Sequence, residues 1–148
     1  MLRNGVESLA PKLAYLTRPY IGVLIGGSNA SYHLNAPEMT ALAAQLASSA
    51  RAMGGSLIVT PSRRTGEENI RILKDALTNV PHDIWNGNGE NPYFGILGLA
   101  DFLIVTCDSV NMVSEAASTG KPVYVADLPG GSAKFERFHA ALHSIVAA

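Results

Sequence analysis

Short apolar runs alternate along the chain with longer stretches in which apolar residues recur at near-helical spacing. The runs are rich in β-branched residues and most end at a small or turn-forming residue, a pattern typical of strands buried in a parallel sheet. It predicts strands at residues 20–25, 56–60, 82–85, 101–106 and 122–126. The pattern is weakest at residues 82–85.

The stretches between these runs predict helices. In the first of them, Leu42, Leu46 and Met53 recur at near-helical spacing and Gly54 supplies a C-terminal stop. Helices are expected at residues 37–53, 67–77, 93–99, 112–118 and 133–147. The last would be a closing helix with apolar side chains on one face, namely Phe135, Phe138, Leu142 and Ile145.

This alternation of strands and helices predicts the architecture. Strands separated by helices of this length form βαβ units, whose helices cover a parallel sheet. We therefore expect a three-layer, Rossmann-like α/β domain with a mostly parallel sheet of five to six strands and helices on both faces. Residues 20–148 would form this domain, and residues 1–19 would be a linker with a short helix that ends before Pro19.

Composition and charge narrow the classes of function. The chain has 148 residues, a net charge of −1 and no basic run longer than Arg63–Arg64, which argues against a nucleic-acid surface. No apolar run is long enough to span a membrane, and the N-terminus lacks the apolar core of a signal peptide. Peripheral contact with a membrane surface is compatible with this composition. A single cysteine rules out an internal disulfide, so a cytoplasmic protein is expected.

Small, polar and cationic residues gather in the loops that follow the predicted strands, whereas the loops that precede the strands are plainer. Because ligands of parallel α/β sheets bind outside the carboxyl ends of the strands, this asymmetry predicts a ligand-binding edge. The first such loop contains Gly26, Gly27, Ser28 and Asn29, which let backbone N–H groups approach an anion. An ordinary turn would explain these residues equally well.

A second loop, after the strand at 101–106, leads into the start of a predicted helix. Free N–H groups and the positive end of the helix dipole make such a start a phosphate site, and an N-cap by an Asp or Ser side chain is compatible with that role. The residues concerned are Asp108, Ser109, Val110, Asn111 and Met112.

Glu115 lies near the start of the same predicted helix. Its carboxylate is suited to accept two hydrogen bonds from ribose hydroxyls. A capping box is not satisfied, because neither Asn111 nor Met112 upstream is a Ser or Thr. The sequence therefore favours a binding role for Glu115.

Three further residues are candidates with simple alternatives. Arg63 is suited to contact a diphosphate, or it belongs to a solvated pair with Arg64. Lys134 would start the last helix, where a cation is unfavourable to the dipole, so it indicates either an anionic ligand or a salt bridge. Trp85 ends a strand beside a Gly/Asn-rich loop and would border a base, unless it is a core residue.

Two of these segments together resemble the GT-B glycosyltransferases. They are the glycine-rich loop at 26–29 and the stretch at 108–123, which is similar to the donor-binding signature of the transferase that makes lipid II in bacterial cell-wall synthesis. The resemblance implies that the helix start, Ser109 to Met112, meets a diphosphate and that Glu115 grips a ribose. It also implies that Trp85 takes the place of the aromatic residue before the base site.

A match over nearly the whole chain is to the uncharacterised mitochondrial-fission family, named for elongated mitochondria. It rests on the segments at 60–65, 89–93 and 106–122. The resemblance implies the C-terminal, donor-binding half of a GT-B fold, which takes a UDP-, GDP- or ADP-linked sugar without a metal or cofactor. It further implies that an N-terminal acceptor domain is missing and that the isolated chain is inactive. No catalytic residue is assigned, since the sequence offers no secure general base.

Other functions remain open to different degrees. Bacterial members of the family are sometimes labelled nucleoside-diphosphate-sugar epimerases, but the G-x-x-G-x-x-G loop and Tyr-x-x-x-Lys pair of the short-chain dehydrogenase type are missing. A hydrolase is disfavoured because the loop at 26–30 lacks the final glycine of a nucleophile elbow. A non-catalytic nucleotide-binding or interaction module stays close to the transferase as an alternative.

Overall fold

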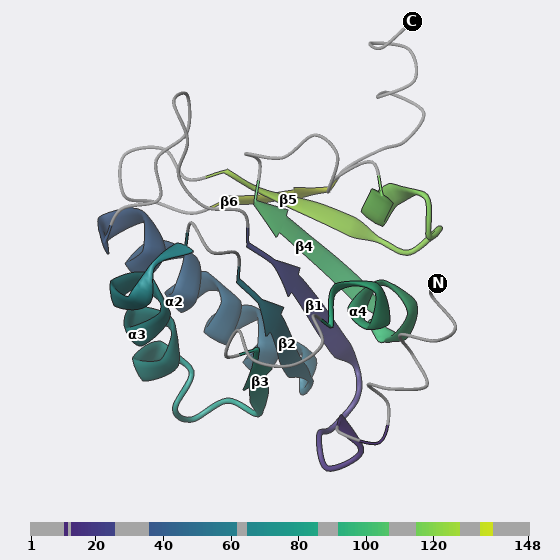
Figure 1. The fold of residues 1–148 in the computed structure, drawn as a ribbon, viewed down its shortest axis with the longest axis horizontal. Coiled ribbons are helices and arrows are strands. Elements are labelled where there is room, and N and C mark those ends of the chain that lie inside the picture. The colour runs from purple at the N-terminus through teal and green to yellow at the C-terminus, as the bar shows by residue number, and fades with distance from the viewer. Residues whose placement is uncertain are drawn as a thin grey trace, which may run out of the picture.

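The computed structural model describes residues 11, 13–25, 36–61, 65–85, 92–106, 115–127 and 134–137. Strands and helices alternate over most of this length (Figure 1). In chain order the elements are β1 (Tyr20–Leu24), α2 (Ala36–Met53), β2 (Ser56–Thr60), α3 (Glu67–Ala76), β3 (His82–Ile84), α4 (Tyr93–Leu99), β4 (Phe102–Thr106), β5 (Val123–Asp127) and β6 (Lys134–Arg137).

The strands form one six-stranded sheet in the order β3-β2-β1-β4-β5-β6. The pairs among β1 to β5 are parallel, and β6 pairs antiparallel with β5. Along the chain the sheet grows from β1 through β2 to β3 in one direction, and then from β4 to β5 in the other. The strand order therefore reverses between β1 and β4, which makes this pair the topological switch point.

One face of the sheet packs against α2 and α3. Every second residue of β1 and β2 belongs to this layer, as the two-residue period of a strand requires. Its buried members include Ile21, Val23, Leu57 and Val59 from the strands, with Leu42, Leu46 and Leu73 from the helices. Figure 1 shows both helices on this side of the sheet.

The opposite face packs against α4 and the helical residues 115–117. Leu24, Ile58 and Leu103 point to this layer, where they meet Ile96 of α4. Gly22 of β1 lies under α4 at very short range: a Cβ atom at this position would be 2.5 Å from Cγ2 of Ile96. The missing side chain thus lets α4 lie directly on β1.

The fold class is confirmed: the domain is a three-layer α/β structure with a mostly parallel sheet. The five predicted strands are all present, with small differences at their ends. The closing helix expected at 133–147 is wrong over its first part, because residues 134–137 are the antiparallel strand β6. The helix expected within 1–19 and the remainder of the closing helix lie largely outside the described residues, although residues 11 and 13 are helical.

Candidate functional site

The carboxyl ends of β1 and β4 lie side by side at the switch point. Leu24, the last residue of β1, is the register partner of Val105 in β4. The chain leaves β1 through Ile25 into the segment at 26–35 and leaves β4 through Thr106 into the segment at 107–114. The two segments that carry the predicted phosphate-binding residues therefore start from neighbouring strands at one edge of the sheet.

Most of the predicted site residues themselves lie outside the described part of the chain. These are Gly26, Gly27, Ser28, Asn29, Arg63, Asp108, Ser109, Val110, Asn111 and Met112. The described strands show where the segments that carry these residues begin. That these residues bind a ligand remains a prediction.

Glu115 is described, and it lies at the start of the helical residues 115–117 on the α4 side of the sheet. Its side chain is exposed, and its Oε1 atom accepts a hydrogen bond of 3.1 Å from the hydroxyl of Tyr93. Tyr93 is the first residue of α4. The bond therefore joins the helix before β4 to the helical residues after β4, on the face of the sheet that α4 covers.

Tyr93, the partner of Glu115, was not among the residues predicted for the site. It is half-buried, and the ring of Phe94 meets its ring edge-on with centroids 5.1 Å apart. Burial, followed by the hydrogen bond to Glu115 and the charge of that carboxylate, raises the pKa of Tyr93 above its usual range. The hydroxyl is therefore a proton donor throughout the neutral range. Its nearest signal in the sequence was its place directly after the polar loop at 86–92.

Trp85 lies at the carboxyl edge, but farther from the switch point. It directly follows β3, and its backbone N–H donates to the carbonyl of Val59 in β2 at 3.0 Å. Both β2 and β1 separate β3 from β4 in the sheet. The side chain is half-buried. The structure thus brings Glu115 and Tyr93 together but does not bring Trp85 to them.

Lys134 also lies at the carboxyl edge, for a reason that differs from the expected one. It is the first residue of β6 and the register partner of Asp127, the last residue of β5. The argument from an unfavourable helix dipole is therefore wrong, since no helix begins at Lys134.

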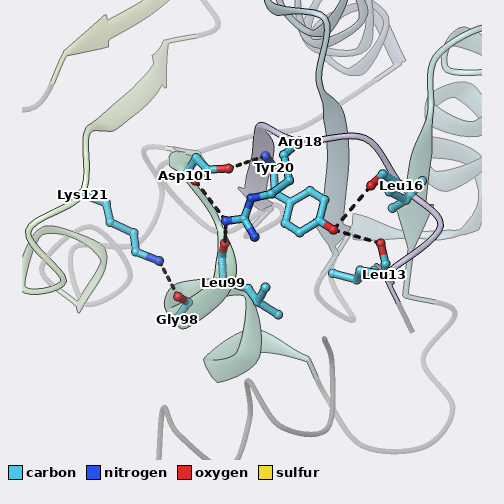
Figure 2. Close-up of polar contacts among 8 residues, drawn as sticks. All are labelled: Leu13, Leu16, Arg18, Tyr20, Gly98, Leu99, Asp101 and Lys121. Carbon is cyan, nitrogen blue, oxygen red and sulfur yellow. Dashed lines mark hydrogen bonds and ion pairs between the residues drawn. The ribbon is translucent and has the colours of Figure 1, made fainter. Parts of the chain in front are cut away.

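The amino edge of the sheet carries a polar network where plain connections were expected (Figure 2). One Asp101 carboxylate oxygen accepts a 2.8 Å hydrogen bond from the backbone N–H of Tyr20, and the other accepts a 3.1 Å bond from the Arg18 guanidinium. That guanidinium also lies 4.5 Å from the ring centroid of Tyr20 and donates to the carbonyl of Leu99. Although burial raises the pKa of Asp101, these hydrogen bonds and nearby cations hold it below its usual value.

Lys121 completes this network from the start of β5. Its Nζ donates a 2.7 Å hydrogen bond to the carbonyl of Gly98 near the C-terminal end of α4, where a cation is favourable to the helix dipole. Burial lowers the pKa of Lys121, while the charge of Asp101 acts in the opposite direction. The contacts within the network join β1, β4, β5 and α4, so its role is to hold the sheet and α4 together.

The described residues contain no group of three His, Cys, Asp or Glu side chains arranged to hold a metal ion. Within the same part of the chain, no helix combines the length and apolar character needed to cross a bilayer.

Comparison with known protein families gives one match across nearly the whole chain. The family model described as "Mitochondrial fission ELM1" matches residues 1–147. The mitochondrial fission protein ELM1 of Arabidopsis thaliana is 38% identical over 128 residues, which cover 84% of this chain and 29% of that relative. The chain thus spans under a third of the length of this relative.

Two solved structures share the fold at low sequence identity. POFUT1 in complex with GDP is 14% identical, with a TM-score of 0.55 over 82% of this chain and 46% of the POFUT1 chain. UDP-GlcNAc 2-epimerase from Neisseria meningitidis, bound to UDP-GlcNAc, is 16% identical, with a TM-score of 0.51 over 82% of this chain and 33% of the epimerase. These likenesses establish the fold.

Proposed function

The chain belongs to the mitochondrial fission ELM1 family, and we propose that it is the donor-binding domain of a GT-B-type glycosyltransferase. In this proposal the carboxyl edge of the sheet holds the nucleoside diphosphate of a UDP-, GDP- or ADP-linked sugar. The proposal commits to the switch point between β1 and β4 as the place where the diphosphate binds.

One observation carries the proposal. The register of β1 on β4 starts the segments at 26–35 and 107–114 from adjacent strand ends. In open α/β sheets the crevice outside such a pair of strand ends is where ligands bind. The exposed carboxylate of Glu115 belongs to the helical residues that follow the segment at 107–114. A diphosphate and a ribose are neighbouring parts of one nucleotide, so in this proposal a single ligand uses both features.

Each predicted residue has a chemical role in this proposal. Backbone N–H groups of residues 109–112 and of Gly27 and Ser28 would bind the diphosphate, assisted by the cations of Arg63 and Lys134. Glu115 would accept hydrogen bonds from the ribose hydroxyls. During transfer the acceptor displaces the diphosphate at the anomeric carbon, and the N–H groups stabilise the charge that develops on the leaving oxygen.

The acceptor and the catalytic base would come from another domain. The chain covers 29% of the Arabidopsis relative and 46% of the POFUT1 chain, so whole proteins of this kind have further residues that this chain does not match. We therefore assign nucleotide-sugar binding to residues 20–148 and transfer to the complete protein.

A second candidate is an epimerase that acts on a nucleotide sugar. The fold likeness to UDP-GlcNAc 2-epimerase means that such an enzyme can be built on this architecture. The missing dehydrogenase motifs therefore argue only against the NAD-dependent type. A protein that binds the nucleotide without any reaction is the third reading. The products distinguish the three functions. A transferase moves the sugar to an acceptor, an epimerase releases a changed sugar without an acceptor, and a binding protein forms no product.

The test is a titration of the chain with UDP, GDP and ADP, read first by thermal shift and then by calorimetry. A ligand at 100 times its Kd stabilises the folded state by about 2.7 kcal/mol. Glu115→Gln removes the negative charge and should weaken binding by roughly tenfold or more, because hydrogen bonds to a carboxylate are stronger than those to an amide.

Asp75→Asn is the matched control. Asp75 is an exposed acidic residue near the C-terminal end of α3, at the amino edge of the sheet. The Asp75→Asn substitution removes one negative charge, as Glu115→Gln does, but far from the proposed site. It should leave the affinity for the nucleotide unchanged. Equal weakening by both variants, or no binding of any of the three nucleotides, would overturn the proposal.

A further inference from the structure

The hydrogen bond between Tyr93 and Glu115 joins two parts of the chain that are 22 positions apart. Tyr93 begins α4, which follows the loop after β3, whereas Glu115 begins the helical residues that follow β4. The bond therefore ties together the helical segments before and after β4, on the face of the sheet that α4 covers.

The tyrosine is held more firmly than the glutamate. Its ring is half-buried against the core layer that contains Ile96 and Leu97, and α4 is fixed on β1 by the close approach at Gly22. Glu115 is exposed on its surface. A free glutamate side chain samples several rotamers, and fixing them at the moment of binding costs free energy. The hydrogen bond to Tyr93 restricts the Glu115 side chain before a ligand binds, which lowers this cost.

The bond to Tyr93 leaves acceptor positions on the Glu115 carboxylate for hydrogen bonds from a ligand. A tyrosine hydroxyl has one proton to donate, and its raised pKa keeps that proton in place at neutral pH. The bond occupies one lone pair on Oε1. An ionised carboxylate has about four acceptor positions, so Oε2 and the second lone pair of Oε1 remain for two vicinal hydroxyls.

We propose that Tyr93 is a positioning residue that presents the Glu115 carboxylate to the 2′- and 3′-hydroxyls of a ribose. The inference rests on the proposed function, which assigns the ribose to Glu115, and it adds Tyr93 as the residue that holds the carboxylate. It adds a residue outside the glycine-rich loop and the helix start, and it assigns recognition of the ribose to a pair of side chains from two different helices.

The experiment compares the ribose and dideoxy forms of each nucleotide across a set of variants of the full chain. The probes are UDP, GDP and ADP, each paired with its 2′,3′-dideoxy form, and the dissociation constants are measured by calorimetry. The quantity of interest is the preference of each variant for the ribose form over the dideoxy form. A purely structural tie between the helices would change affinity for both forms alike.

Tyr93→Phe removes the hydroxyl and keeps the ring. It should lower the ribose preference roughly five- to tenfold, the value of one hydrogen bond that holds a charged group in place, and leave the affinity for the dideoxy form unchanged. In a Glu115→Ala background the same change should have no effect on the preference. Phe94→Leu, which alters the neighbouring ring and keeps the Tyr93 hydroxyl, should retain the wild-type preference.

The outcomes separate the two claims. If a nucleotide binds the wild type and Tyr93→Phe leaves the ribose preference intact, or weakens both forms equally, the positioning role is wrong while the nucleotide site stands. If Tyr93→Phe lowers the preference also in the Glu115→Ala background, the tyrosine does not act through Glu115. If none of the three nucleotides binds the wild type, the proposed function fails and the positioning role fails with it.

Discussion

At the scale of single residues, two carboxylates of the protein are used in different ways. At the amino edge of the sheet, Asp101 accepts hydrogen bonds from Arg18 and from the backbone of Tyr20, and these contacts hold parts of the scaffold to one another. After β4, Glu115 accepts a bond from Tyr93 and keeps an exposed carboxylate. The first arrangement is satisfied within the chain, whereas the second has capacity for a ligand.

The amino-edge network makes the stability of the protein depend on pH. The pKa of Asp101 lies below its ordinary value of 3.8, so its stabilising contacts are complete above that value and are lost as the pH falls through the lower, folded-state pKa. Asp101→Asn should lower the free energy of unfolding by roughly 1 kcal/mol at pH 7 and flatten the loss of stability in acid. Urea unfolding between pH 7 and pH 2.5 measures both effects.

The exposed Asp75 again supplies the control for that experiment. Asp75→Asn should leave the acid limb of the stability profile as steep as in the wild type. If Asp101→Asn and the wild type lost stability in parallel below pH 4, the network would not contribute as described.

Residue roles were only partly predictable from the sequence. Glu115 was selected because a carboxylate near a helix start after a strong strand is suited to accept ribose hydroxyls and no capping box explained it. Tyr93 was missed because its role depends on the distance between two helices, which no local pattern encodes. Asp101 was predicted only as the first residue of a strand, and Lys121 fell in a plain connection between elements. Both were missed for the same reason, because their partners are supplied by β1 and α4.

At the scale of elements, α4 is the part of the fold whose position matters most for the site. It presents Tyr93 at its first residue, and it is held at its other end by Lys121 and Arg18. Between these ends it lies on β1 at Gly22. A displacement of α4 would therefore move Tyr93 away from Glu115.

Gly22→Ala tests this packing. The added methyl group would lie 2.5 Å from Cγ2 of Ile96 and 3.0 Å from Cβ of Ala100, so either α4 or β1 must move. We expect a loss of about 1–3 kcal/mol in the free energy of unfolding. Gly54→Ala is a useful comparison because nothing lies within 4 Å of its added Cβ and only its positive φ of 67° opposes the change, at about 1 kcal/mol. Chemical denaturation of both variants should rank Gly22→Ala as the more destabilised.

Most elements followed from local pattern, and the exception at β6 has a physical reason. The spacing of Phe135, Phe138, Leu142 and Ile145 fits a helical period. Residues 134–137 instead pair with the edge of the sheet along β5, which supplies backbone hydrogen bonds that a local pattern does not reveal. Tertiary pairing thus decided the state of a short segment whose own preference was ambiguous.

At the scale of the whole molecule, the order of the strands determines which strand ends lie next to each other at the switch point. The sequence predicted the parallel sheet and the polar edge, because both depend on periodicity and on which residues follow each strand. It could not give the strand order, which depends on long-range pairing. That order, with β1 beside β4, brings the starts of the two candidate segments together at one edge of the sheet.

The membership of the ELM1 family and the fold shared with GDP- and UDP-GlcNAc-bound proteins are compatible with this view at the level of architecture. The donor role and the ribose contact are our proposals. They share one central claim, which is that a nucleoside diphosphate binds at the carboxyl edge between β1 and β4.

The most direct test is to map that binding on the chain by NMR. Amide resonances of the isotope-labelled protein are followed while UDP, GDP or ADP is added. We predict that the largest changes fall on Ile25 and Thr106 at the carboxyl edge and on Glu115, with little change at Tyr20, Asp101 and Lys121 at the amino edge. Changes confined to the amino edge, or no changes with any of the three nucleotides, would contradict the account.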